Sequence, residues 1–193
     1  MAYIVELFSV PVLCVKLDLD VSSIEKFCLD YQDKNEGRYV SNEGGYQAEF
    51  PVDTKQIKPL IDEITKYATT FVGAYSLNVD FVIDQIWMNI NGLKDYNILH
   101  NHPMSIFSGV YYIKAPENCG NIKFEHPAID VLSFAHSEFN FTEWNKFNSS
   151  VHWQPAEENI LYLFPGWLKH RVESNLSNEN RISMSFNTTS KSQ

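Results

Sequence analysis

The stretch KHRVESNLSNENRISMSFN, residues 169–187, decides the fold and the chemistry that we expect of this chain. It holds two strand-like runs, KHRVES and RISMSFN, with a polar loop between them. Ten residues separate His170 from Arg181, and Ser183 follows two positions later. Residues i and i+2 of a strand face the same side, so Arg181 and Ser183 are predicted to share one face.

A second pair of histidines lies upstream, in the run YNILHNH at 96–102. His100 and His102 are two positions apart, so both can point into a barrel, as can His170 from a later strand. Imidazole is a good ligand for Fe(II). When protein ligands occupy one face of the metal, its other coordination positions stay open for a co-substrate and O₂. We therefore predict that these three histidines bind a metal.

Arg181 and Ser183 suit a keto-acid co-substrate of such a metal. 2-Oxoglutarate chelates the metal through its keto-acid end, and its distal carboxylate then needs a cation and a hydroxyl. The planar guanidinium group of Arg181 can bind a carboxylate through two hydrogen bonds, and Ser183 can supply the hydroxyl.

Composition places limits on the class of protein. The 193 residues are 44% hydrophobic, with three widely spaced cysteines and a net charge of -9, and we predict one domain over 1–193. The acidic charge argues against electrostatic binding of nucleic acid, and the cysteines indicate reduced thiols. The chain shows no signal peptide and no apolar run of about eighteen residues, so we expect a cytoplasmic protein without a membrane partner.

The order of elements predicts helices followed by strands. We expect a strand pair bent at Pro11 over 3–17, a helix over 21–34 capped by Ser22 or Ser23, and a helix over 55–75, with a tight turn at Gly44 and Gly45 between the helices. Helical support is thus expected mainly over 21–75. Short strands are expected over about 79–189, in a β-sandwich or barrel. The expected runs are 79–90, 96–102, 105–115, 120–126, 131–136, 150–155, 159–165, 169–174 and 181–189.

These motifs resemble the 2-oxoglutarate/Fe(II) oxygenase superfamily. The chain is similar to a bacterial and phage branch of unknown substrate, the 2OG-Fe(II) oxygenases, and it also resembles prolyl and aspartyl/asparaginyl hydroxylases. The matching stretches are SNEGGYQ (41–47), WMNINGLKDYNILHNHP (87–103), SGVYYIKAPENCGNIKFEHP (108–127) and LFPGWLKHRVESNLSNENRISMSFN (163–187). The resemblance implies a mainly β fold with flanking helices, a double-stranded β-helix (jelly roll, cupin-like). It also implies Fe(II), 2-oxoglutarate and O₂, with succinate and CO₂ as products.

The third metal ligand departs from the superfamily pattern. The superfamily has His-x-Asp or His-x-Glu where this chain has His100-x-His102. His102 replaces the carboxylate in the interpretation we favour. Alternatively His100 binds without it, as in the aspartyl/asparaginyl hydroxylases, or an acid such as Asp95 or Glu125 completes the set.

Further residues are weaker candidates for the site. Three residues of the run SGVYYIK are candidates for the co-substrate, with one tyrosine expected to face the barrel: Tyr112, Tyr111 and Ser108. Three alternating residues are candidates for the substrate pocket: Trp87, Asn89 and Asn91. Three other histidines are expected to be structural or on the surface: His126, His136 and His152.

We therefore predict a dioxygenase that hydroxylates a peptidyl side chain or a small molecule. Two alternatives stay open from the sequence. One is a cupin-like three-histidine dioxygenase that does not use 2-oxoglutarate, which the Arg181-x-Ser183 pair argues against. The other is a jelly-roll binding module without catalysis, in which the histidines only pack.

Overall fold

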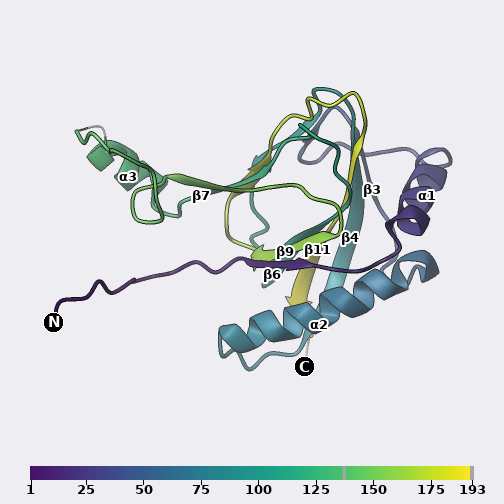
Figure 1. Cartoon of the computed structure of the whole chain (residues 1–193). Helices are drawn as coiled ribbons and strands as arrows, with labels where there is room; N and C mark the ends of the chain where they lie inside the picture. The colour runs from purple at the N-terminus through teal and green to yellow at the C-terminus, as the bar shows by residue number, and fades with distance from the viewer. Residues whose placement is uncertain (137, 192–193) are drawn as a thin grey trace.

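Two facing antiparallel sheets form a double-stranded β-helix, and helices cover the outer face of the larger sheet (Figure 1). The computed structural model describes residues 1–136 and 138–191. The larger sheet has six strands in the order β1-β9-β6-β11-β4-β3, and the smaller has five in the order β2-β5-β10-β7-β8. The mainly β fold predicted from the sequence is confirmed.

The larger sheet consists of β1 (Leu13–Lys16), β3 (Tyr46–Glu49), β4 (Phe81–Asn91), β6 (Phe107–Lys114), β9 (Ile160–Pro165) and β11 (Arg181–Ser190). The smaller sheet consists of β2 (Asn42–Glu43), β5 (Tyr96–His100), β7 (Ile122–Glu125), β8 (Val151–Gln154) and β10 (His170–Val172). Strands β6 and β9 are buried on both faces, because one face meets the helices and the other faces the barrel interior.

Two helices pack against the outside of the larger sheet. They are α1 (Val21–Gln32) and α2 (Lys58–Ala74), the latter preceded by the short η1 (Lys55–Ile57). In α2, buried Leu60, Ile64, Ala68 and Phe71 recur at intervals of three and four residues, which places them on one face of the helix. Pro59 lies in the first turn of α2, where its missing N–H breaks no helical bond.

A tight turn joins the two sheets along one edge. Strand β2 pairs with β5 of the smaller sheet, whereas β3 pairs with β4 of the larger one. The turn between them contains Gly44 and Gly45 with φ of 66° and 63°, a backbone conformation that glycine adopts without strain. The tight turn predicted at these glycines is confirmed.

Three local predictions were wrong. Only Leu13–Lys16 of the expected strand pair over 3–17 is a strand, because the residues before it have no partner strand. The cap of α1 is Asp20, whose carboxylate accepts the N–H of Ser23, so neither serine is the cap residue. The run 131–136 lies in the helix α3 (Ile129–His136); a short apolar run of this kind does not by itself distinguish strand from helix.

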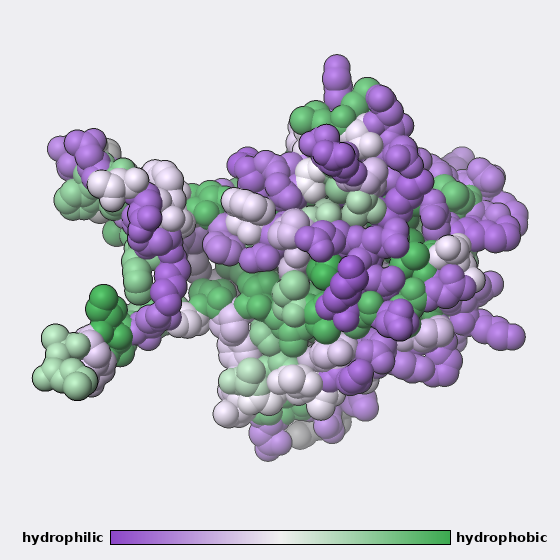
Figure 2. Space-filling model, viewed as in Figure 1, coloured by the Kyte–Doolittle hydropathy of each residue, from purple (hydrophilic) through white to green (hydrophobic). Residues whose placement is uncertain are grey.

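The N-terminal residues and α3 project from the body on the same side (Figure 1). Figure 2 shows apolar side chains at the end of this N-terminal arm, where Tyr3, Ile4 and Phe8 are exposed. The described part of the chain contains no helix with the length and apolar character needed to span a bilayer.

Gly109 in β6 provides a test of the packing around Phe186, in the layer between the larger sheet and the helices. A Cβ at this position would collide with the ring of Phe186 and lie 2.5 Å from the carbonyl oxygen of Tyr162. We expect Gly109→Ala to lower the free energy of unfolding by about 1–3 kcal/mol, as overpacking does. Gly73→Ala is the control, because nothing lies within 4 Å of a Cβ there. It should be neutral or raise stability by up to about 1 kcal/mol. Urea unfolding measures both, and equal effects of the two substitutions would contradict the packing described.

Candidate metal centre

Three histidines converge at one place between the sheets. His100 ends β5 and His170 begins β10, and the two are register partners in the smaller sheet. His102 follows β5, and one nitrogen from each of the three rings lies within 4.8 Å of the others. Among the described residues, these three form the cluster of three or more His, Cys, Asp or Glu side chains that could hold a metal ion.

Two of these imidazoles are oriented in the same way, by a hydrogen bond to the backbone carbonyl two residues earlier. Nδ1 of His100 lies 2.7 Å from the carbonyl oxygen of Ile98, and Nδ1 of His170 lies 2.9 Å from that of Leu168. A carbonyl oxygen can only accept, so each Nδ1 must carry the proton. Nε2 of each ring therefore keeps a free lone pair, which is the form that binds a metal.

His102 is held in a different way. It lies beyond the end of β5, and its backbone N–H donates to the carbonyl oxygen of Gly166 at 2.7 Å. A side chain at position 166 would collide with the carbonyl oxygens of His102 and Ser105, so this close approach requires glycine. The imidazole of His102 stacks on that of His170 at 5.2 Å and lies 5.7 Å from the Trp87 ring.

Burial keeps these histidines neutral. It lowers the pKa of His100 and of His170, and it lowers the pKa of His102 to about 4, with a further contribution from His100. A neutral imidazole is the state that a metal ligand needs. The donor set therefore fits a divalent transition metal such as Fe(II).

Arg181 is a buried cation with an unused donor. It is 1% exposed, and its Nη1 donates to the carbonyl oxygens of Cys119 and Glu173, the latter at 2.9 Å. Its Nη2 is buried without a hydrogen-bond partner, as is the hydroxyl of Tyr112. Unpaired buried donors are costly, and a carboxylate can accept a hydrogen bond from each of them. Ser183 lies beside Arg181 on the same face and lines the cavity with it.

The two tyrosines of the run SGVYYIK face opposite sides of the larger sheet. Tyr112 belongs to the interior cluster, whereas Tyr111 belongs to the cluster under the helices and donates its hydroxyl to Asn159. Ser108 is buried but donates to Asn187 and does not line the cavity of the histidines. Of these three candidates for the co-substrate, Tyr112 is the one that belongs to the interior cluster and is the register partner of Ser183. Burial raises the pKa of its hydroxyl, and the positive charge of Arg181 opposes that rise.

The three candidates on β4 divide along the strand. Trp87 and Asn89 line the cavity, and Asn91 lies one step farther along, opposite Arg181 in the register. The acids considered as third ligands lie elsewhere. Asp95 accepts the N–H of Gly92, and Glu125 lines a hollow beside the N-terminal arm.

The remaining histidines lie outside the cluster. The N–H of Ala128 donates to His126, His152 bonds the amide of Gln154, and His136 ends α3. Sequence reasoning missed the parts of the site made by the backbone: the carbonyls that hold Arg181 and the glycine at position 166. Backbone carbonyl groups leave no signal in the pattern of side chains. The one trace in the sequence is the glycine at position 166, which is required because a Cβ there would collide with neighbouring backbone.

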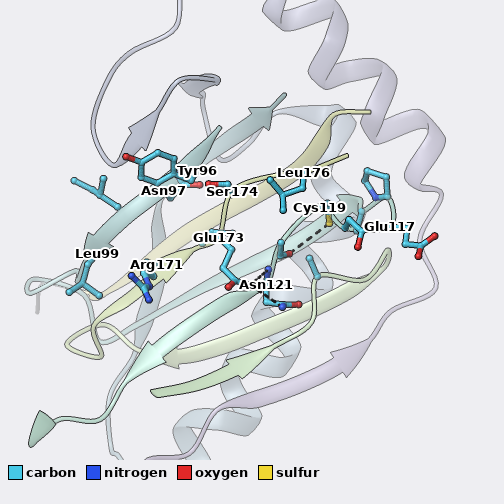
Figure 3. Close-up of a pocket in the computed structure, with 17 residues that line it drawn as sticks. Tyr96, Asn97, Leu99, Glu117, Cys119, Asn121, Arg171, Glu173, Ser174 and Leu176 are labelled. Carbon is cyan, nitrogen blue, oxygen red and sulfur yellow. Dashed lines mark hydrogen bonds between the residues drawn. The ribbon is translucent and has the colours of Figure 1, made fainter. Parts of the chain in front are cut away.

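A hollow larger than the cavity of the histidines lies elsewhere on the described structure. It measures about 960 Å³ and lies against the smaller sheet, with Tyr96, Arg171, Glu173 and Leu176 around it (Figure 3). None of the three clustered histidines lines it. Among their lining residues, this hollow and the inner cavity share Asn97 on β5 and Val172 on β10. Both spaces therefore border on these two strands of the smaller sheet.

Comparison with solved structures finds the same fold in other proteins. A prolyl-4-hydroxylase from Pseudomonas putida superposes with a TM-score of 0.66 at 10% identity, over 95% of this chain and 95% of that one. The α-ketoglutarate-dependent carbocyclase SnoK of nogalamycin biosynthesis gives 0.67 at 10% identity, over 93% and 79%. HygX from Streptomyces hygroscopicus, solved with nickel, 2-oxoglutarate and hygromycin B, gives 0.63 at 9% identity, over 93% and 83%. No curated protein matches the chain.

The sequence itself identifies the family. Residues 85–187 match the family described as "Putative 2OG-Fe(II) oxygenase". This match covers more than half of the chain and includes all three clustered histidines, Arg181 and Ser183. The protein therefore belongs to the 2OG-Fe(II) oxygenase family, enzymes that use Fe(II) as cofactor and 2-oxoglutarate as co-substrate.

Proposed function

We propose that His100, His102 and His170 bind the Fe(II), and that Arg181 binds the distal carboxylate of 2-oxoglutarate with Ser183 and Tyr112. The observation that carries this proposal is a single cavity lined by three clustered histidines and by a buried guanidinium with a free donor. The histidines and the guanidinium stand on facing sheets and line the same cavity, so we assign the two ends of one dicarboxylate to them.

The residues of the chain bind, orient and exclude water. Fe(II) with 2-oxoglutarate, when bound, supplies O₂ activation and the oxidation of an unactivated C–H bond. Arg181 fixes one end of the co-substrate, which sets the position of the keto-acid end relative to the histidines. The apolar interior residues Val110, Ile122 and Phe164 line the same cavity and keep bulk water from it.

The substrate that we propose is a peptidyl side chain or a small molecule, and the reaction is a hydroxylation. Solved proteins of this fold include a prolyl hydroxylase and enzymes of natural-product biosynthesis, so the fold accommodates both classes. The net charge of -9 leaves nucleic acid as a poor substrate.

The metal site is tested by anaerobic titration of the purified protein with Fe(II) and 2-oxoglutarate. We expect the weak visible charge-transfer band of a chelated keto-acid in the wild type and its loss in His170→Ala. His152→Ala is the control, because His152 lies on β8 outside the cluster, and it should keep the band. Bound iron without a band in the wild type would support a three-histidine dioxygenase that acts without 2-oxoglutarate. Absence of bound iron would support a binding module.

The role of Arg181 is tested by Arg181→Lys, which keeps the charge but loses the planar pair of donors. We expect the dissociation constant of 2-oxoglutarate to rise about 10- to 100-fold, as for loss of a charge-assisted hydrogen bond. The control is Arg171→Lys on β10, whose side chain is exposed, and it should bind 2-oxoglutarate as the wild type does. Unchanged affinity in Arg181→Lys would exclude Arg181 from the carboxylate site.

The adjacent tyrosines form a matched pair for a third test. Tyr112→Phe removes a buried hydroxyl without a partner, so it should not lower the free energy of unfolding but should weaken 2-oxoglutarate binding about 3- to 10-fold. Tyr111→Phe breaks the hydrogen bond to Asn159, so it should cost about 1 kcal/mol of stability and leave 2-oxoglutarate binding unchanged. Urea unfolding and the anaerobic titration separate the two effects, and the reverse pattern would refute the assignment.

A further inference from the structure

A row of polar side chains crosses the interior face of the larger sheet at one level. Gln47 on β3 pairs with Asn89 on β4, Asn89 pairs with Ser183 on β11, and Ser183 pairs with Tyr112 on β6. Directly opposed residues of antiparallel strands share a face, with Cβ atoms about 4.5–5.5 Å apart. Asn89 and Ser183 line the cavity, and Gln47 and Tyr112 continue the same face of the sheet on either side of them.

Two members of this row carry oxygen atoms that accept no hydrogen bond. Gln47 is 2% exposed and Asn89 is 5% exposed, and Oε1 of the first and Oδ1 of the second are buried without a partner. The Nδ2 of Asn89 donates to the hydroxyl of Ser185 at 3.4 Å, which leaves its Oδ1 as the free group. Such unsatisfied buried acceptors are rare in folded proteins and call for a donor from a ligand or ordered water.

2-Oxoglutarate does not supply this donor. As a dianion it offers only acceptor oxygens, and these match the donors of Arg181, Tyr112 and Ser183 at the other end of the row. The row is therefore divided into a donor half, on β11 and β6, and an acceptor half, on β3 and β4. The acceptor half fits a second molecule, and in an oxygenase that molecule is the substrate.

The charge of the cavity limits the kind of donor. Among the described residues that line it there is no carboxylate, and Arg181 already contributes a positive charge. A buried ammonium group would find no protein carboxylate among these described residues, and the two carboxylates of 2-oxoglutarate are assigned to Arg181 and to the metal. Unpaired buried charges are strongly disfavoured. The donor is accordingly a neutral N–H or O–H group.

We propose that Gln47 and Asn89 form a substrate subsite for a neutral hydrogen-bond donor, a carboxamide or a hydroxyl group. The chain passes from β2 in the smaller sheet to β3 at the edge of the larger one, which places Gln47 beside Asn89. The proposal rests on the proposed function, because it assigns the donor half of the row to 2-oxoglutarate.

The first test needs neither iron nor substrate. Gln47→Leu and Asn89→Leu each remove an unsatisfied buried oxygen, and at Asn89 the substitution also loses the long hydrogen bond to Ser185 (3.4 Å), so the melting temperature of the metal-free variants should stay close to that of the wild type or exceed it. Asn175→Leu is the control: Asn175 is fully buried, and its amide bonds the backbone of Asn91, Glu179 and Ser177, so its loss should lower the melting temperature. A fall in melting temperature for Gln47→Leu and Asn89→Leu like that of the control would show a structural role and overturn the proposal.

The second test uses matched probes on the anaerobic holoenzyme with Fe(II) and 2-oxoglutarate. Acetamide and ethylene glycol carry donors, whereas N,N-dimethylacetamide and 1,2-dimethoxyethane are their methylated counterparts without donors. At least one donor probe should shift the charge-transfer band saturably in the wild type, while its methylated counterpart does not, and acetamide and ethylene glycol distinguish a carboxamide from a hydroxyl subsite. In Gln47→Leu and Asn89→Leu the same shift should need at least tenfold more probe, with the affinity for 2-oxoglutarate within twofold of wild type.

The outcomes separate the two proposals. A band that responds to no donor probe, or equally to the methylated probes, overturns the subsite alone. A loss of 2-oxoglutarate affinity in both leucine variants also overturns it, because the amides would then serve the co-substrate. Absence of the band from the wild type counts against the proposed function, and the melting comparison still decides whether the two amides are structural.

Discussion

Strand β11 hydrogen-bonds along both edges, to β4 and to β6, and this double pairing determines what faces the barrel interior. Because a strand alternates with a period of two, a shift of one residue would turn Arg181 and Ser183 out of the cavity and bring Ile182 in. The apolar residues Ile182, Met184 and Phe186 prevent this shift, since they are buried in the layer between the sheet and the helices. The hydrophobic packing of one face thus holds the polar chemistry on the other.

The same logic explains how much could be predicted from the sequence. The alternation of polar and apolar residues in 181–187 predicted the shared face of Arg181 and Ser183. The i, i+2 spacing predicted that His100 and His102 lie close together, and they do, although β5 ends at His100 and a loop holds His102. Long amphipathic segments such as α2 were predicted for the same reason, because periodicity is strongest over several turns. Positions at the ends of elements were predicted less well, as the cap at Asp20 shows.

What could not be predicted depends on contacts between distant parts of the chain. Alternation states that Tyr111 and Tyr112 face opposite sides but not which side is inside, and that choice is made by where α1 and α2 pack. The run 131–136 has the composition of a strand, yet it lies in a segment that projects from the body and finds no sheet to join. The acceptor oxygens of Gln47 and Asn89 became visible only when the register of β3, β4 and β11 was known.

The three histidines differ in how firmly the fold holds them. His100 and His170 belong to neighbouring strands and are locked to each other by the ladder between β5 and β10. His102 lies beyond that ladder and is held by backbone hydrogen bonds to Gly166 and Ser105. The centre therefore combines two ligands positioned by strand pairing with one ligand positioned by a loop. A substitution in the loop around Gly166 can therefore move the third ligand while both sheets stay intact.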